Sequence, residues 1–386
     1  MEADRPRAQS LTRRSPVALG FAALLALAVL FSPRVTREMR DFEVYRTAAA
    51  RAIDAAPLYR PDDGHFQFKY LPAFAVAAAP VAFLPLRVAK TLWFGVSVAL
   101  IWTLVALSLA TLPERRRPTW VLVGVLIVAM GKFYGHELVL GQVNLLFAVL
   151  VVLGILAIGR GRDGLAGALC VAAVVVKPYA VLFLPWLVVT RGRRALVSIA
   201  IGTVVVAAAP VALYGLPGTL ALHRAWWTTV TDSTAPNLTN PDNVSVAAMF
   251  AKWLGAGDAA AIIAGAVGLV LLATAAFVVT RGRGVHRRES LEGALLLTLV
   301  PLLSPQGWDY VFLVATPAIA LLANYDALLP RAMRVLAWIA IPAIGLSLFD
   351  LLGRQGYAQF MSWSVITVCF FVVVASLTAL RVRRAA

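Results

Sequence analysis

The chain of 386 residues is 61% hydrophobic and only 14% charged. Soluble globular domains carry about 25% charged residues, so this composition excludes an ordinary soluble enzyme. The mean hydropathy is +0.82, and long apolar runs alternate with short basic segments. Because each crossing of a bilayer needs about 20 apolar residues, the pattern predicts a polytopic membrane protein.

The net charge of +16 does not indicate nucleic-acid binding. Lys and Arg stand in small groups beside hydrophobic segments, as is typical of the cytoplasmic flanks of membrane spans. Cys170 and Cys369 both lie inside apolar runs, so no disulfide framework is expected. The expected partners therefore include a lipid bilayer and no nucleic acid.

Basic clusters assign the sides of the membrane, because Lys and Arg beside short loops stay in the cytoplasm. Arginines before residue 16 place the N-terminus inside, and an uncleaved first helix over 16–31 then leads out. An external first loop is expected over 33–71. Within it, residues 40–56 are expected to form a helix on the membrane surface, with Phe42 and Tyr45 on its apolar face.

The next segment, residues 71–86, contains three prolines in a short apolar run. It is expected to be a broken, partly inserted segment, because irregular backbone is tolerated at membrane depth only against protein or a wet cavity. The expected spans that follow cover residues 88–111, 119–131, 145–159, the two arms of a hairpin over 165–190, 195–214, 259–280, 290–303, 311–323, 334–349 and 360–380.

The hairpin turns at Lys177, where a cation inside the membrane needs a partner or a polar cavity. External loops are expected at residues 131–144, 215–257, 304–310 and 351–360. The fold class is thus predicted to be all-α: a single transmembrane domain over 1–386 with about 12 spans, in the range of roughly 11 to 13. Both termini are expected in the cytoplasm.

Asp41 is the carboxylate best placed for chemistry. At 100° per residue it lies within about 40° of Tyr45 and borders the face that meets the protein, whereas Glu43 points to water. A carboxylate beside a reacting hydroxyl can act as a general base. It can equally cap the start of the helix, where Asp is favoured, and the pattern alone leaves both interpretations open.

Two external loops, GQVN at 141–144 and SPQGWDY at 304–310, combine amides, aromatic rings and a carboxylate. These groups can bind sugar hydroxyls and cover a sugar ring, although Trp and Tyr at membrane boundaries are also ordinary interface anchors. His136 with Glu137, and His65 with the neighbouring aspartates, fit no specific metal-ligand spacing. No metal site is expected.

Several segments in a fixed order resemble glycosyltransferase family 87, the bacterial polyprenyl-phosphate-mannose-dependent α-(1→2)-mannosyltransferases. The similarity runs from about residue 15 to residue 325 and rests on DFEVYRTAAARAIDAAPLY, FKYLPAFAVAAAPVAFLPL, GQVNLLFAVLVVLG, GLAGALCVAAVVVKPYAVLFLPWLVVTRGRR and LLSPQGWDYVFLVATPAIALL. The resemblance implies a fold of the GT-C superfamily, with a large first external loop whose acidic residue serves catalysis. It implies no metal or cofactor.

Carried over by this resemblance, Asp41 matches the catalytic aspartate of the first loop. Lys177 and Arg40 are expected to bind the donor phosphate. The side chains expected to contact substrate are Tyr45, Tyr70, Gln142, Asn144, Tyr179, Gln306, Trp308 and Asp309. Asp309 departs from the pattern, because members often have histidines just after the Trp; this leaves the acceptor and the transferred sugar open.

The expected reaction moves a sugar, most simply mannose, from a polyprenyl-phosphate donor to a lipid-linked or membrane-proximal acceptor. It would occur on the external face of a bacterial cell (inner) membrane, with inversion. Arabinofuranosyl or other pentosyl transfer by the same mechanism is one alternative. A lipid or solute transporter is another, since intramembrane lysines and broken helices also mark transport sites. Polar groups collected at outer helix ends, without a visible repeat, favour the enzyme.

Overall fold

The computed structural model describes residues 25–26, 29–30, 32–281 and 287–384. Throughout this described part the regular structure is helical, and Asn243 and Trp308 form an isolated antiparallel bridge. The all-α prediction is therefore confirmed for these residues. The first helix expected over 16–31 lies mostly outside them.

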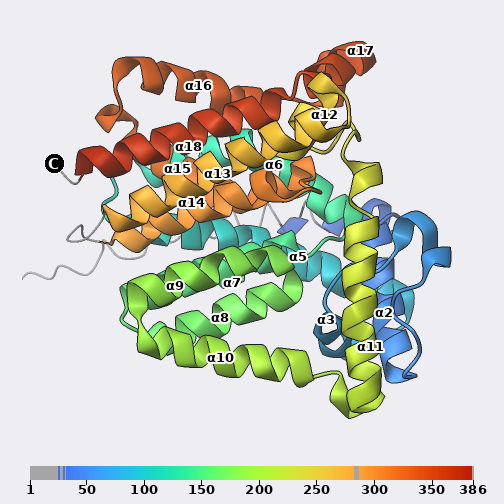
Figure 1. Cartoon of the computed structure of the whole chain (residues 1–386). Helices are drawn as coiled ribbons and strands as arrows, with labels where there is room; N and C mark the ends of the chain where they lie inside the picture. Colours follow the sequence, from blue (N-terminus) through green and yellow to red (C-terminus); the bar gives the residue numbers. More distant parts are fainter. Residues whose placement is uncertain (1–24, 27–28, 31, 282–286, 385–386) are drawn as a thin grey trace, which may run out of the picture.

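The long helices lie side by side in a bundle (Figure 1). They are α5 (Leu86–Ala110), α6 (Thr119–Leu140), α7 (Asn144–Gly159), α8 (Asp163–Val176), η2 (Pro178–Leu182) with α9 (Phe183–Arg191), α10 (Arg193–Ala208), α13 (Asp258–Thr280), α14 (Arg288–Leu303), η4 (Asp309–Ala315) with α15 (Thr316–Tyr325), α16 (Arg331–Gly345) and α18 (Val365–Arg384). The hairpin predicted around Lys177 is present as α8, η2 and α9.

Five helical segments in the described part are long and apolar enough to cross a membrane, or up to seven if each of two bent pairs forms one span. The predicted number of about 12 spans is not confirmed. Helix α7, for example, has 16 residues, which gives about 24 Å of helix against a hydrocarbon core of about 30 Å. The several apolar helices identify a multi-pass membrane protein.

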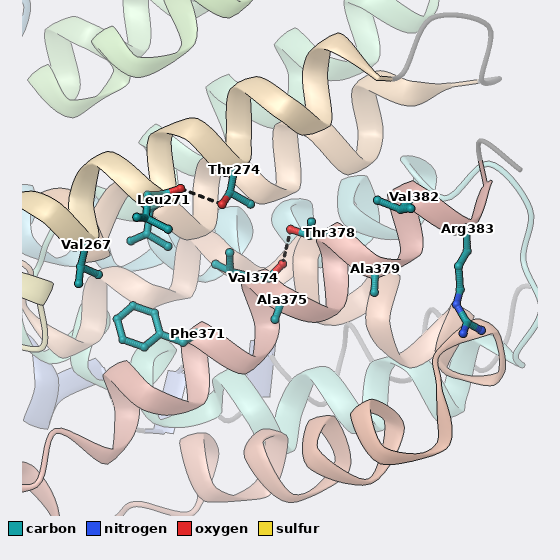
Figure 2. Close-up of a pocket in the computed structure, with 11 residues that line it drawn as sticks. Val267, Leu271, Thr274, Phe371, Val374, Ala375, Thr378, Ala379, Val382 and Arg383 are labelled. Carbon is teal, nitrogen blue, oxygen red and sulfur yellow. Dashed lines mark hydrogen bonds between the residues drawn. The ribbon is translucent and has the colours of Figure 1, made fainter.

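The outer surface of the bundle suits a lipid environment. Large apolar side chains such as Leu92 on α5 and Leu269 on α13 are exposed. Figure 2 shows a groove of about 620 Å³ between α13 and α18, lined mainly by apolar side chains with Arg383 at one end. Surfaces of this kind are stable against lipid chains, whereas a soluble protein rarely exposes them.

The basic clusters gather at one end of the bundle. Arg117, between α5 and α6, pairs with Asp326 in η5 (Asp326–Leu328) at 2.7 Å. Near the end of α18, Arg383 donates to the carbonyl oxygen of Leu328 at 3.3 Å. The connections α5–α6 and α15–α16 and the C-terminal end of α18 therefore meet at this end, which we call the basic end.

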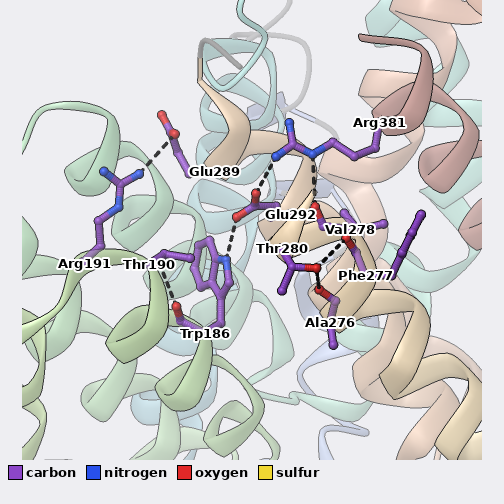
Figure 3. Close-up of polar contacts among 10 residues, drawn as sticks. All are labelled: Trp186, Thr190, Arg191, Ala276, Phe277, Val278, Thr280, Glu289, Glu292 and Arg381. Atoms are coloured by element: carbon purple, nitrogen blue, oxygen red, sulfur yellow. Dashed lines mark hydrogen bonds and ion pairs between the residues drawn. The ribbon is translucent and has the colours of Figure 1, made fainter. Parts of the chain in front are cut away.

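A buried ion pair fastens four helices near the basic end (Figure 3). Arg381 of α18 donates from Nη2 to Oε1 of Glu292 of α14 at 2.8 Å, and the indole N–H of Trp186 of α9 donates to Oε2 at 2.8 Å. Arg381 also donates from Nε to the carbonyl of Val278 of α13 at 3.3 Å. Each oxygen of the Glu292 carboxylate thus has a donor, which a buried charge requires.

The remaining helices lie across the opposite end of the bundle, where Figure 1 labels α2, α3, α11, α12 and α17. They are α2 (Arg40–Ile53), η1 (Pro61–Phe66), α3 (Pro72–Ala77), α4 (Ala79–Ala82), α11 (Val211–Asp232), η3 (Ala235–Asn237), α12 (Val246–Leu254) and α17 (Phe349–Ser362). The chain bends by 90° between α10 and α11 and by 104° between α16 and α17. The break predicted within 71–86 is confirmed by the two short helices α3 and α4, and its partial insertion into the membrane stays a prediction.

Three expected loops are helical instead. Helix α6 continues to Leu140, so the loop predicted at 131–144 shrinks to residues 141–143. The segments 215–257 and 351–360 form most of α11, α12 and α17. Hydropathy does not distinguish such segments from loops, because an amphipathic helix at the end of a bundle is also mixed in polarity while satisfying its own backbone hydrogen bonds.

Candidate functional site

Helix α2 places Asp41 at the start of its buried face. The buried residues of this helix are Phe42, Tyr45, Ala48, Ala49 and Ala52, which agrees with the predicted apolar face. The residue at the N-cap is Met39, with φ of 37° and no side-chain cap hydrogen bond. Asp41 lies inside the first turn, where the helix dipole favours a negative charge, so its interpretation as the N-cap is wrong.

The carboxylate of Asp41 is bound by Gln142, which stands in the short turn between α6 and α7. Gln142 donates from Nε2 to Oδ2 of Asp41 at 2.7 Å. The same nitrogen lies 3.4 Å from the hydroxyl of Tyr310 in η4. The predicted catalytic residue and the predicted amide therefore meet, although 101 positions separate them in the chain.

The oxygen of the Gln142 amide accepts hydrogen bonds from a lysine and two tyrosine hydroxyls. Oε1 of Gln142 accepts from Tyr45 Oη at 2.8 Å, from Tyr70 Oη at 3.2 Å and from Lys177 Nζ at 3.3 Å. The two phenol oxygens are themselves 2.7 Å apart. We call Asp41, Gln142, Lys177, Tyr45, Tyr70 and Tyr310 the Asp41 network.

Lys177 lies at the break between α8 and η2, as predicted. Its Nζ donates to Tyr70 Oη at 2.9 Å and lies 4.8 Å from the centre of the Tyr70 ring. Among the ion pairs of the described residues none involves Lys177; its attraction to Asp41 and Glu137 acts at longer range. The hydroxyl, the ring and the amide hold the ammonium group in place without neutralising it.

Burial raises the pKa of the Asp41 carboxyl above its ordinary value of 3.8. The hydrogen bond from Gln142 and the charge of Lys177 oppose this effect but do not cancel it. A carboxylate with a raised pKa is a stronger base and is better matched to proton transfer. A carboxyl whose pKa is shifted by burial and by a nearby charge is also typical of functional sites.

Glu137 fixes the turn that carries Gln142. This fully buried carboxylate accepts from Asn144 Nδ2 at 2.8 Å and from the backbone N–H of Leu145 at 3.0 Å. It thereby satisfies the start of α7, whose first N–H groups have no partner within the helix. Asn144, predicted to contact substrate, is 0% exposed and donates to Glu137 at 2.8 Å; its contact with substrate stays a prediction.

In the loop after α14, Gln306 contacts residues outside the Asp41 network. Gln306 donates to the hydroxyls of Ser233 and Thr234 at 3.1 and 3.3 Å. The backbone of Trp308 pairs with Asn243, so this part of the loop ties the 238–245 segment to the bundle. Tyr179 lies in η2, two positions after Lys177.

Arg40 lies on another side of α2. Its side chain is 60% exposed and pairs with Glu43 at 3.6 Å. Glu43 also pairs with Lys90 at 2.6 Å, so it does not simply point to water as expected. In the first loop, Arg51 binds Asp63 through two hydrogen bonds of 2.5 and 2.8 Å, which gives that carboxylate a structural role.

Asp309, predicted to contact substrate, is 0% exposed. Its Oδ2 lies 2.9 Å from Lys132 Nζ, and its Oδ1 lies 3.5 Å from His136 Nδ1. Both partners are on α6. Sequence reasoning considered His136 only as a metal ligand and did not consider Lys132, because nothing in the chain order pairs either residue with η4.

Comparison with known proteins gives one result that bears on this site. The model of glycosyltransferase family 87 matches residues 68–305, a range that includes Tyr70, Gln142 and Lys177 but begins after Asp41. No curated protein sequence matches the chain. The family match covers more than half of the protein and includes the turn and the hairpin that hold the Asp41 network. The chain belongs to glycosyltransferase family 87, and its activity is that of a membrane glycosyltransferase.

Proposed function

We propose that this glycosyltransferase moves mannose from a polyprenyl-phosphate donor to a lipid-linked or membrane-proximal acceptor, with inversion at the anomeric carbon. One observation carries the proposal. A carboxylate of raised pKa, Asp41, and a lysine without a paired carboxylate, Lys177, bind opposite ends of the Gln142 amide. Such a pair supplies a base and a cation to the same reaction.

In the proposed reaction, the oxygen of an acceptor hydroxyl attacks the anomeric carbon. Asp41 accepts the proton of that hydroxyl at the same time. The new glycosidic bond forms as the bond from that carbon to the donor phosphate oxygen breaks. The electron pair of the broken bond leaves with the polyprenyl phosphate. Lys177 stabilises the phosphate by a charge-assisted hydrogen bond, which is stronger than a neutral one.

Gln142 has a separate part in this scheme. Its N–H group holds Asp41 at 2.7 Å and its oxygen accepts from Lys177 at 3.3 Å. The amide therefore prevents the carboxylate and the ammonium group from closing on each other as an ion pair. Each charge stays available to a substrate, and neither side chain must reorganise before the reaction, which is the condition for electrostatic catalysis.

The membrane arrangement supports a lipid-linked donor. By the positive-inside rule, the basic end of the bundle faces the cytoplasm. The Asp41 network then lies toward the external face of a bacterial cell membrane, and both termini are cytoplasmic. A site at membrane level lets a polyprenyl chain remain in the bilayer while its phosphate reaches Lys177, without extracting the apolar chain into water.

The test is product analysis with purified full-length protein in lipid nanodiscs. Polyprenyl-phosphate-[¹⁴C]mannose and a membrane lipid extract are supplied, and the expected result is a labelled glycolipid whose new linkage has the anomeric configuration opposite to that of the donor. Retention of configuration would contradict the single displacement. In proteoliposomes, passage of the labelled sugar across the membrane without a new glycosidic bond would contradict the transferase assignment.

A further inference from the structure

A second polar cluster lies beside the Asp41 network and has no part in the proposed transfer. It consists of Lys132 and His136 on α6 and Asp309 at the start of η4. Asp309 is fully buried, and its two carboxylate oxygens face different partners, Lys132 at 2.9 Å and His136 at 3.5 Å. A buried carboxylate is costly unless it is paired, and Lys132 provides the opposite charge for Asp309. The position of His136 beside the same carboxylate therefore needs a different reason.

The orientation of His136 follows from its exposure. Its Nδ1 atom, which faces Asp309, is inaccessible, whereas 42% of the side chain is exposed. The accessible part of the ring is therefore the opposite edge, which carries Nε2. The Asp309 carboxylate, 3.5 Å away and outside hydrogen-bond geometry, favours by its charge a proton on that nitrogen. Nε2 of the neutral ring is then free to accept a hydrogen bond.

His136 is also close to the proposed reaction centre. Its ring lies edge-on to Tyr310 with the ring centres 5.7 Å apart. The hydroxyl of Tyr310 lies 3.4 Å from Nε2 of Gln142, the same nitrogen that holds Asp41 at 2.7 Å. A single aromatic ring, that of Tyr310, thus separates His136 from the Asp41 network.

The surroundings of the cluster match a carbohydrate. Lys132 lies 5.3 Å from the centre of the Tyr357 ring, and Tyr357 Oη donates to Oδ1 of Asp242 at 3.3 Å. Tyr357 and Asp242 are both half-buried. Aromatic rings together with a few fixed hydrogen-bonding groups are the usual lining of small-molecule sites, and the ring faces suit the apolar side of a sugar.

We infer that His136 binds a hydroxyl of the acceptor and that this acceptor presents a sugar at the external face. The inference rests on the proposed function, because it assigns the acceptor subsite of the same centre. Asp309 is a positioning residue: it fixes the tautomer and the orientation of His136 and touches no substrate. Bound in this way, the sugar ring directs a neighbouring hydroxyl toward Asp41.

The kinetic test uses octyl α-mannoside as the acceptor probe with the full-length protein. In His136→Gln the KM for the glycoside rises about fivefold, the size expected for one lost neutral hydrogen bond. The kcat and the KM for the donor stay within about twofold. His223→Gln is the matched control, because the hydrogen bond of His223 stays within α11, to the carbonyl of Thr219 at 2.9 Å. An unchanged acceptor KM in His136→Gln would overturn the inference while leaving the transferase assignment intact.

A binding test works without turnover. The chain has 4 histidines, so a spectrum of [¹⁵N]histidine-labelled protein is simple, and comparison with His136→Gln assigns the His136 signals. Octyl α-mannoside shifts the Nε2 signal of His136, and Asp309→Asn removes the preference for the Nδ1-protonated tautomer. If His136→Gln does not fold, His136→Asn serves for assignment.

The two tests distinguish a failure of the acceptor subsite from a failure of the proposed transfer reaction. If the wild-type protein transfers no sugar to the glycoside, the spectrum still decides the inference. A glycoside-dependent shift at His136 supports the subsite even then. No shift at glycoside concentrations that saturate other signals, or a tautomer unchanged in Asp309→Asn, would overturn it.

Discussion

The two ends of the bundle each hold charged side chains away from water, but in opposite ways. Near the basic end, Arg381 and Glu292 pair directly at 2.8 Å, and Trp186 binds the second carboxylate oxygen. In the Asp41 network an amide stands between the carboxylate and the lysine. The first arrangement satisfies its charges internally. The second leaves them without a direct ion pair, an arrangement that is typical of functional sites.

The largest effect on stability is expected from breaking the ion pair between Arg381 and Glu292. Arg381→Met leaves Glu292 charged and buried, which costs about 3–5 kcal/mol in the free energy of unfolding. SDS titration of the protein in mixed micelles measures this loss. The double variant Glu292→Gln with Arg381→Met recovers most of it, because two neutral groups need no compensation. A single variant as stable as wild type would show that the pair is not structural.

The next-largest effect is expected on donor affinity, in the Asp41 network. Lys177→Gln removes a charge-assisted hydrogen bond to the donor phosphate, worth about 1.5–3 kcal/mol, so donor affinity falls roughly 10- to 150-fold. Binding of a polyprenyl-phosphate analogue to the nanodisc protein measures it. Arg40→Gln is the control and changes affinity less than about threefold, since Arg40 pairs with Glu43 outside the network. Equal losses in both variants would remove the specific role of Lys177.

The pH dependence follows from the direction of the Asp41 shift. The base must be ionised, so kcat/KM falls as pH decreases through a pKa that burial has raised above 3.8. Folding stability has the opposite sign, because a raised carboxyl pKa favours the protonated form in the folded state. Its contribution is full below the unfolded pKa and is lost as pH rises through the folded one. An acidic limb centred below 3.8 in the pH–rate profile would contradict this.

The smallest effect is expected in the first loop. Asp63→Asn breaks the pair with Arg51, whose side chains are 23% and 16% exposed, and costs less than about 1 kcal/mol because such pairs are partly screened. The hydrogen bonds from Arg51 lower the pKa of Asp63. The stabilisation is therefore present above pH 3.8 and is lost as pH falls through the lowered pKa. Thermal unfolding of the variant across this pH range measures it.

The sequence predicts one part of the fold better than another. Helix α13 is a uniform apolar run with charges at both ends, and its predicted bounds, 259–280, match Asp258–Thr280. The segment 351–360 mixes glycines with polar and apolar residues, and in α17 it is mostly exposed and broken at Gly353. A uniform apolar composition predicts the first helix, whereas a mixed composition does not distinguish the second from a loop.

In the candidate site, the sequence likewise predicts some features and not others. Asp41, Gln142 and Lys177 stand out as polar residues in apolar surroundings, and helical phasing orients Asp41 toward the protein. The contacts between them, and the partners of Asp309 on α6, join residues far apart in the chain. Such pairs follow from the arrangement of helices, which periodicity alone does not give. The burial of Asp309 and its contacts with Lys132 and His136 are visible only in the fold.

The central claim is that Asp41 acts in the reaction while its neighbour Glu43 acts in the structure. The most direct measurement compares the rate of mannose transfer, and the melting temperature, of Asp41→Asn and Glu43→Gln. Asp41→Asn should lose a factor of about 10² to 10⁴ in rate and melt no lower than wild type, because the buried charge is removed. Glu43→Gln, which breaks the 2.6 Å pair with Lys90, should melt lower and keep its rate per folded molecule. Transfer by Asp41→Asn at the wild-type rate would contradict the account.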